Sequence, residues 1–181
     1  MIEKFSNKKI AVVLGFYNGN EFIDAQIKSI LDQSFKNIDI FIFDDNSNIN
    51  IEFRKIKLKK YKSKIKITKR KKNIGYAKNF LLGLKEVGND YDFYAFSDQD
   101  DIWEKDKIIR GVNALNSEDS NTPKLYCSRT TYYNSECKKE IGSSKIFSKK
   151  PTFANALLQN IAGGNTILMN DIARNLVIKT V

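Results

Sequence analysis

Three of the four residues at positions 98–101 are carboxylates: Asp98, Asp100 and Asp101. They follow the apolar run of residues 93–96, which predicts a strand buried on both faces of a sheet. Open α/β sheets bind their ligands beyond the carboxyl ends of such strands. Carboxylates this close together repel one another unless water, protons or a metal ion relieve the repulsion. The segment therefore predicts either a divalent-metal site for a phosphorylated ligand or an acidic turn that caps the next helix.

A second pair of carboxylates, Asp44 and Asp45, follows the apolar run of residues 38–43. In a doubly wound sheet both acidic segments would emerge at the same edge. The first apolar run ends at residues 17–20 without a Gly-x-Gly-x-x-Gly fingerprint, and the chain contains no Gly-x-x-x-x-Gly-Lys-Ser/Thr motif. The sequence thus argues against a dinucleotide-binding fingerprint and against a P-loop.

A phosphate could instead be neutralised by a metal ion held on Asp98 and Asp100. Mg²⁺ or Mn²⁺ commonly takes one or two carboxylates and completes its shell with phosphate oxygens and water. Basic side chains from residues 69–78 could supply further positive charge. For the run of residues 69–72 itself, we favour a solvated face over a binding patch.

The 181-residue chain carries 31 Lys and Arg against 21 Asp and Glu, a net charge of +10. This charge favours anionic partners, but Lys, Asn and Ile are abundant throughout, so charge alone does not choose between them. The absence of histidine excludes Ser-His-Asp and Cys-His catalysis and His-ligated metals. Cys127 and Cys137 are too few for a zinc site and could form one disulfide, although we expect free thiols. With no signal-peptide core in residues 1–9 and no membrane-spanning run, we expect a cytoplasmic protein.

Apolar patterning predicts alternating strands and helices, the rhythm of a parallel sheet with helical crossovers. The N-terminal part predicts strands over residues 9–16, 38–43, 65–68 and 93–96, and helices over 20–33 (with Asn20 as N-cap), 49–61, 80–87 and 104–116. The C-terminal part predicts strands over 125–128, 130–133 and 166–169, a polar loop over 136–150, a short helix over 152–158, and a last helix to 178 capped by Asn170. No internal repeat and no second domain is evident.

Five pieces of this pattern resemble the donor-binding core of the family 2 glycosyltransferases, which have the GT-A fold. These pieces are Phe16-Tyr17-Asn18, Ser29-Ile30-Leu31-Asp32-Gln33-Ser34, Asp44-Asp45-Asn46-Ser47, Asn73-Ile74-Gly75 with Lys78-Asn79, and Ser97-Asp98-Gln99-Asp100-Asp101-Ile102-Trp103. Their order and spacing are specific, and the resemblance extends over residues 9–170. The last piece is most similar to the bacterial rhamnosyltransferase-like branch, which builds surface polysaccharides.

The resemblance implies an α/β fold of the GT-A (Rossmann-like) type, with a mostly parallel twisted sheet flanked by helices and a short antiparallel portion. It implies one nucleotide-sugar-binding domain over residues 1–181. The implied activity is metal-dependent, inverting transfer of a sugar from a dTDP- or UDP-linked donor to a saccharide or lipid-linked acceptor. Mg²⁺ or Mn²⁺ is the implied cofactor. Peripheral association with the inner face of the membrane remains open, and no nucleic-acid partner is expected.

The resemblance also assigns the residues that bind the donor. Tyr17 would lie against the nucleotide base, and Asp45 would form a hydrogen bond with it. Asp98 would lie near the ribose and the metal, with Asp100 as a direct metal ligand. Lys78 would approach the diphosphate.

Three further residues complete the donor-binding set: Gly15, Gly75 and Gln99. Gly15 stands where the family usually has Thr or Pro, so one side-chain contact to the base is missing. Structural roles compete with two of the assignments, since Asp45 could cap the next helix and Tyr17 could pack in the core. Trp103 is interpreted as a core residue rather than a sugar platform.

The general base of the family is an Asp that follows a loop resembling residues 162–165, in a His-Asp-Trp-like segment. This chain has no histidine, and Asp171 follows Asn170 so closely that it is better interpreted as the first residue of a helix. We therefore expect the base beyond Val181, in a chain that is truncated and that binds a donor with weak or absent transfer.

Other classes of function remain open at this point. The leading alternative is a non-catalytic nucleotide-sugar-binding module. A nucleotidyltransferase would normally show a basic, glycine-rich turn after the first strand, and residues 15–20 contain no Lys or Arg. A nucleic-acid binder is the weakest option, because the lysines are scattered over several elements.

Overall fold

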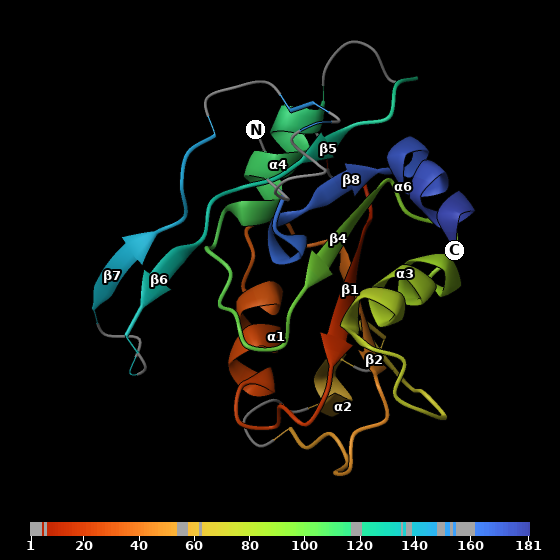
Figure 1. Ribbon diagram of the computed structural model, residues 1–181, viewed down its shortest axis with the longest axis vertical. Helices are drawn as coiled ribbons and strands as arrows, with labels where there is room; N and C mark the ends of the chain where they lie inside the picture. Colours follow the sequence, from red (N-terminus) through yellow and green to blue (C-terminus); the bar gives the residue numbers. More distant parts are fainter. Residues whose placement is uncertain are drawn as a thin grey trace.

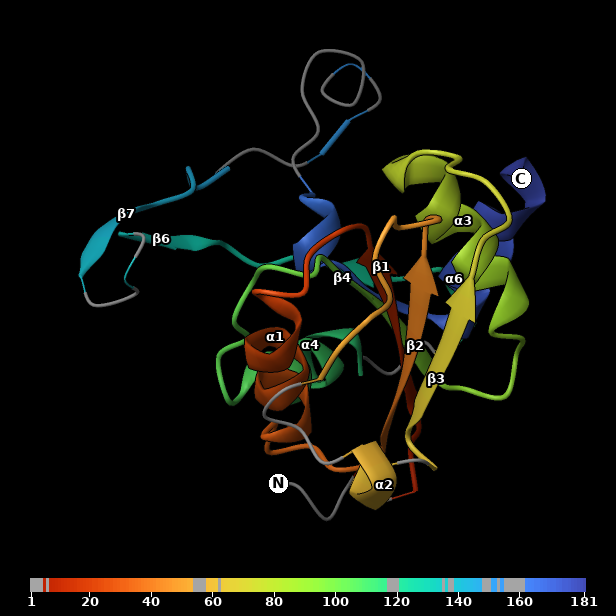
Figure 2. The same cartoon turned by 90° about the horizontal axis from the view of Figure 1, so that it is seen from below.

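The computed structural model describes residues 5, 7–53, 58–61, 63–116, 121–134, 136, 139–147, 151–152, 154 and 162–181. A six-stranded sheet forms its centre, with helices on both faces (Figure 1). A separate two-stranded sheet, made of β6 (Thr131–Tyr133) and β7 (Glu140–Ser143), extends away from this body in both views (Figures 1 and 2).

The central sheet is mostly parallel, as predicted. Its parallel strands are β1 (Ile10–Phe16), β2 (Ile38–Asp44), β3 (Ile65–Lys69) and β4 (Phe93–Ser97). The antiparallel portion consists of β8 (Leu168–Asn170), which pairs with β4, and β5 (Leu125–Tyr126), which pairs with β8. The resulting order is β3-β2-β1-β4-β8-β5, and this places the carboxyl ends of β1, β2 and β4 side by side.

Helices cover both faces of the sheet (Figure 2). One face carries α1 (Ile23–Leu31) and α4 (Lys107–Leu115), and the other carries α3 (Tyr76–Glu86) and α6 (Asp171–Val177). The shorter helices are α2 (Leu58–Tyr61), η2 (Gly164–Thr166) and η3 (Ile178–Thr180). Each of the four longer helices was predicted from the sequence.

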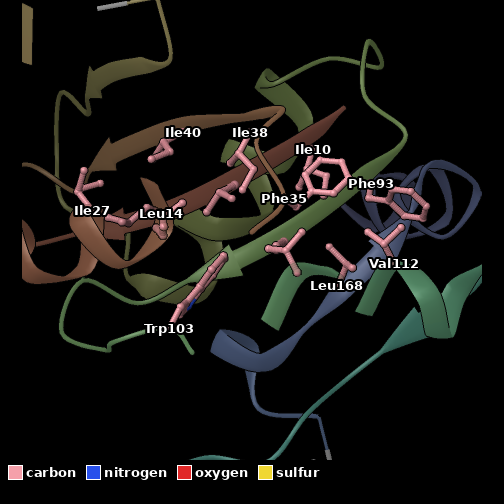
Figure 3. Close-up of a cluster of buried hydrophobic side chains, with 14 of the residues drawn as sticks. Ile10, Leu14, Ile27, Phe35, Ile38, Ile40, Phe93, Trp103, Val112 and Leu168 are labelled. Atoms are coloured by element: carbon pink, nitrogen blue, oxygen red, sulfur yellow. The ribbon is translucent and has the colours of Figure 1, made fainter. Parts of the chain in front are cut away.

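Successive strand residues point to opposite faces, so the sheet separates two cores. Ile10 and Leu14 of β1 belong to the core under α1 and α4 (Figure 3), whereas Val13 belongs to the core under α3. Trp103 is only 5% exposed and joins the first core, which confirms its interpretation as a core residue.

The helix predicted over residues 49–61 is wrong for most of its length. Residues 49–53 have no helical structure, α2 covers only Leu58–Tyr61, and residues 54–57 lie outside the described part. Asn20 does not cap α1 either. Its side chain donates to the carbonyl of Asn50 (2.9 Å) and accepts from the backbone N–H of Glu52 (3.2 Å), so it holds the non-helical segment of residues 50–52 in place.

Two C-terminal predictions also need correction or remain untested. The segment predicted as a polar loop contains β7, which pairs with β6. The short helix predicted over 152–158 lies almost wholly outside the described residues. In contrast, the Asn170 cap is confirmed, because its side chain accepts a hydrogen bond from the backbone N–H of Ala173 (2.9 Å).

Two expectations from composition concern thiols and membranes. Cys127 is a free thiol, as expected, and Cys137 lies outside the described residues. Within the described ranges, no helix has both the length and the apolar character needed to cross a membrane.

Candidate functional site

A cavity of about 460 Å³ opens where β1, β2 and β4 end. The residues that line it are Gly15, Phe16, Tyr17, Asp45, Asn73, Gly75, Tyr76, Asn79, Phe80, Asp98, Gln99 and Asp100. The loops after three parallel strands and the start of α3 therefore meet at one place. This is the edge at which open α/β sheets bind ligands.

The structure brings together nearly all of the residues predicted for the site. Those that line the cavity are Gly15, Tyr17, Asp45, Gly75, Asp98, Gln99 and Asp100. Lys78 is exposed on the first turn of α3 and is not among the lining residues, so its predicted approach to a diphosphate gains no support from the geometry.

Asp45 fixes the turn that precedes α3. Its two carboxylate oxygens accept hydrogen bonds from the backbone N–H groups of Ile74 (2.8 Å) and Gly75 (2.9 Å), and the residue is only 4% exposed. The alternative role as a cap of the next helix is wrong, because the residues that follow it form no helix. Each oxygen retains a second acceptor position that a ligand could use.

Gln99 joins the loop after β4 to the loop after β1. Its side chain accepts from the backbone N–H of Tyr17 (2.8 Å) and donates to the carbonyl of Tyr17 (3.1 Å). Gly19 makes this approach possible, since a Cβ there would clash with the Gln99 amide. The Tyr17 side chain is 46% exposed, so the alternative of ordinary core packing is wrong.

Two glycines shape the wall of the cavity. A Cβ on Gly15 would lie 3.0 Å from the ring of Phe80, which lines the cavity beside it. The absence of a side chain at Gly15 therefore makes room for the phenyl ring of Phe80 rather than for a ligand. Gly75 has φ +84°, a conformation that favours glycine, and it begins α3.

The acidic segment places two carboxylates, those of Asp98 and Asp100, at the cavity. Burial, together with the charges of Asp101 and Asp100, raises the pKa of Asp98 to about 6. Asp101 is absent from the lining and accepts a hydrogen bond from the Asn165 side chain (2.7 Å). Burial is the main cause that raises the pKa of Asp101, and the hydrogen bond from Asn165 opposes it.

These carboxylates suit a metal that is shared with a phosphorylated ligand. In the described part of the chain, no group of three or more Asp, Glu, His or Cys residues could hold a metal by protein ligands alone. Mg²⁺ and Mn²⁺ accept one or two carboxylates when phosphate oxygens and water supply the rest. Asp98 and Asp100, which both line the cavity, therefore fit such a metal.

Sequence reasoning did not assign five lining residues to the site: Phe16, Asn73, Tyr76, Asn79 and Phe80. Tyr76 is 81% exposed at the first position of α3. Asn79 is buried, donates to the carbonyl of Phe43 (2.7 Å) and accepts from Arg70 Nε (2.9 Å). The available signal was position, because Phe16 directly precedes Tyr17 at the end of β1 and the other four lie at or near the turn that opens α3.

The basic run of residues 69–72 divides into two parts. Lys69 donates to the carbonyl of Ser47 (2.9 Å), and Arg70 lies over the ring of Phe43 while bonding to Asn79. Lys71 and Lys72 are exposed, as a solvated face requires. The run therefore braces the loops around the cavity and contributes no lining residue.

The sequence matches one known protein family over most of its length. The family model for glycosyl transferase family 2 matches residues 11–176. The chain is 39% identical over 102 residues to the dTDP-rhamnosyl transferase RfbG of Shigella flexneri, a match covering 55% of this chain and 35% of that protein. It is 29% identical over 170 residues to the UDP-Glc:alpha-D-GlcNAc-diphosphoundecaprenol beta-1,3-glucosyltransferase WfaP of Escherichia coli, covering 92% of this chain and 63% of that protein. The chain thus spans about a third of the first relative and less than two thirds of the second.

Among solved structures, the mannosyltransferase PcManGT from Pyrobaculum calidifontis, in complex with GDP-Man and Mn²⁺, is similar to this chain with a TM-score of 0.51. The match covers 61% of this chain and 33% of that protein at 14% identity. At this identity the likeness concerns the fold alone. It agrees with the GT-A architecture predicted from the sequence.

Proposed function

The chain belongs to glycosyl transferase family 2, and on this basis we propose that its cavity binds the nucleoside diphosphate of a sugar donor. The observation that carries the proposal is the gathering of two carboxylates, an exposed aromatic ring and the start of α3 around one cavity of about 460 Å³. This volume lies within the range of small-molecule sites. The combination suits a ligand with a base at one end and a diphosphate at the other.

The base would lie at the side of the cavity formed by Tyr17 and Asp45. The half-exposed ring of Tyr17 offers a face for stacking, and its backbone is held on both sides by Gln99. The carboxylate of Asp45 is already oriented by the two amides of the 74–75 turn, so it can accept from a base N–H without reordering.

The diphosphate would lie toward Asp98, Asp100 and the start of α3. A divalent cation on these carboxylates, when bound, would supply positive charge for the diphosphate that departs from the sugar. The N-terminal turn of α3 adds backbone N–H groups at the same cavity, where Gly75 keeps the approach free of a side chain. Asp98 and Asp100 would thus orient the leaving group rather than attack the sugar.

The transfer that we propose is an inverting displacement, in which an acceptor hydroxyl attacks the anomeric carbon of the donor sugar. The two curated relatives are named for a dTDP-linked rhamnosyl donor and for a UDP-glucose donor with a lipid-diphosphate acceptor. We extend these classes to this chain: a dTDP- or UDP-linked donor and a saccharide or lipid-linked acceptor. A lipid-linked acceptor would bring the protein to the membrane surface in the cytoplasm.

The test is a thermal-shift panel of UDP-glucose, dTDP-rhamnose and GDP-mannose, each with Mn²⁺ or with EDTA. At a ligand concentration about 100 times Kd, binding adds about 2.7 kcal/mol to the free energy of unfolding, which corresponds to a rise in Tm of about 5 °C. We expect this rise for a UDP- or dTDP-linked sugar with Mn²⁺. Asp100→Ala should remove the Mn²⁺-dependent part.

The matched control is Asp106→Ala, because Asp106 is exposed near the same loop and its side chain caps no helix. This variant should keep the full Mn²⁺-dependent rise in Tm. An equal rise in Asp100→Ala would show that the metal assignment is wrong. If no sugar nucleotide stabilises the wild-type protein under any condition, the proposed function itself fails.

A further inference from the structure

Three polar side chains, two from α1 and one from the turn that follows it, face the acidic segment (residues 98–101) from the interior of the protein. Gln26, Ser29 and Gln33 are spaced three and four residues apart, so they lie on one side of the helix and its C-terminal end. Gln26 and Gln33 are completely buried. Buried amides cost free energy unless they are hydrogen-bonded, so their partners are informative.

Gln26 connects the beginning of the acidic segment to its end. With its amide oxygen turned toward them, it accepts from Ser97 Oγ (2.6 Å) and from Trp103 Nε1 (3.2 Å). Its amide nitrogen then donates to the backbone carbonyl of Asp101. One buried side chain therefore contacts Ser97 before the acidic segment, the backbone of Asp101 at its end, and Trp103 two residues further on.

The other two side chains hold the backbone from Trp103 to the first turn of α4. Ser29 Oγ accepts from the backbone N–H of Trp103 (2.9 Å). Gln33 donates to the carbonyl of Glu104 (2.8 Å) and accepts from the backbone N–H of Ile108 in the first turn of α4. The side chain of Asp106, the N-cap residue of α4, makes no capping bond, and Gln33 in the turn after α1 supplies an acceptor for the first turn of α4 instead.

The acidic segment needs such external support. Its three carboxylates, Asp98, Asp100 and Asp101, lie within four residues and repel one another. Residues 98–104 belong to no strand or helix, so no ladder of backbone hydrogen bonds fixes them. The buried amide of Gln26 forms hydrogen bonds both with Ser97, which precedes the segment, and with Trp103, which follows it.

We propose that Gln26 is a positioning residue that holds Asp98 and Asp100 in the geometry for a metal-bound diphosphate. Its hydrogen bonds go to Ser97, the Asp101 carbonyl and Trp103, so it acts on the carboxylates of Asp98 and Asp100 through their neighbours. Gln33 has a different role, because its side chain forms hydrogen bonds with Ser29, Glu104 and Ile108 and so supports the start of α4. The expected effect of Gln26 on nucleotide binding rests on the proposed function. Its expected effect on the conformation of residues 97–103 rests only on the hydrogen bonds described above.

The experiment compares Gln26→Leu with Gln33→Leu, which removes an equally buried amide just beyond the C-terminal end of the same helix. Isothermal titration with UDP, in Mn²⁺ and in EDTA, separates the metal-dependent part of the affinity from the rest. We expect Gln26→Leu to raise Kd at least tenfold in Mn²⁺ and to leave Kd in EDTA within twofold of wild type. Gln33→Leu should leave both values within twofold, although it also lowers stability.

Amide hydrogen exchange supplies a readout that needs no ligand. In Gln26→Leu, peptides that cover residues 97–103 should exchange at least tenfold faster, while peptides from β1 keep wild-type rates. Unchanged exchange would overturn the role of Gln26 in holding the segment. Faster exchange with an unchanged Mn²⁺-dependent Kd would overturn its role in positioning the acids.

Two provisions keep the test decisive. If Gln26→Leu does not fold, Gln26→Asn takes its place, because it keeps the amide but shortens its reach by one methylene group. A loss of affinity of the same size in Mn²⁺ and in EDTA would indicate general loosening and contradict the inference. If the wild-type protein binds no nucleotide, the proposed function fails, and hydrogen exchange alone decides whether Gln26 holds the segment.

Discussion

The two parts of this chain that form β-structure differ sharply in how they are stabilised. In β1 and β2, six of seven residues in each strand are buried, and in β4 all five are. In β5, β6 and β7, strands of two to four residues contain no buried residue. Six large apolar side chains are exposed in that second region: Leu125, Tyr132, Tyr133, Ile141, Ile146 and Phe147.

The difference explains where the candidate site can lie. Every residue that lines the cavity comes from the ends of the parallel strands or from the loops and helix that follow them, and none comes from β5, β6 or β7. A two-stranded hairpin is marginally stable by itself, whereas a sheet covered by helices on both faces can hold side chains at fixed positions. The rigid part therefore carries the donor site that we propose, and we expect the hairpin region to open more readily.

The largest expected effect breaks the rigid part directly. Ile40→Ala in β2 removes a side chain with no exposed surface from the core under α1, and it should lower the free energy of unfolding by about 3 kcal/mol. Ile141→Ala in β7 removes the same atoms from a residue that is 65% exposed. Its effect should stay within about 0.5 kcal/mol.

Urea unfolding followed by circular dichroism measures both values. Equal losses for the two variants would show that the hairpin is covered by something that the described contacts do not include. A small loss for Ile40→Ala would mean that the core under α1 relaxes to fill the space.

The same contrast separates what the sequence could predict from what it could not. Continuous apolar runs predicted β1, β2 and β4 because burial alone determines those strands. The acids that follow β2 and β4 could be placed at one edge by topology alone. The sequence was therefore sufficient to predict that these carboxylates gather at one edge of the sheet.

Tertiary contacts decided the segments that were predicted wrongly. The spacing of Ile51 and Phe53 suggests a helix, yet both pack against the core from a non-helical segment that Asn20 holds by two hydrogen bonds. The strand β7 is polar and exposed, so pairing with β6 rather than burial defines it. Gln26 went unnoticed because a polar residue in an amphipathic helix ordinarily faces water.

A smaller effect concerns a charge buried behind the acidic segment. Lys107 lies over the ring of Trp103, with Nζ 4.7 Å from the ring centroid, and burial lowers its pKa to about 8. Because the ordinary pKa is 10.5, the unfolded chain binds this proton more tightly than the folded protein between about pH 8 and 10.5. The cost of burying the charged lysine is therefore complete below about pH 8 and disappears as the pH rises to 10.5.

The comparison of wild type with Lys107→Met isolates this effect, because the other titrating groups are common to both proteins. The stability of wild type relative to the variant should increase by about 2 kcal/mol between about pH 7.5 and 10.5, allowing for partial exposure of the lysine. Lys145→Met, at an exposed lysine next to the hairpin, serves as the control and should show no such change. A flat difference for Lys107→Met would mean that water reaches the ammonium group.

The smallest expected effect lies where the two parts of the chain meet. Asn170 ends β8, and its side-chain oxygen accepts from the backbone N–H groups of Ala173 (2.9 Å) and Lys124 (3.0 Å). Its amide nitrogen donates to the carbonyl of Thr122 (2.8 Å). One side chain thus caps α6 and also holds the residues that lead into β5. Hydrogen bonds therefore stabilise this region, where β5 buries no side chain.

Asn170→Ala should lower the free energy of unfolding by about 1 kcal/mol, the usual cost of losing a helix N-cap. Asn170→Asp keeps the acceptors for α6 and for Lys124 and loses only the donor to Thr122, so its loss should be less than half as large. Urea unfolding measures both values, and hydrogen exchange should show faster opening of α6 and β5 than of β1. If Asn170→Ala instead loosens β1 as much as β5, the two parts unfold as one cooperative unit, and the contrast between them concerns burial but not local stability.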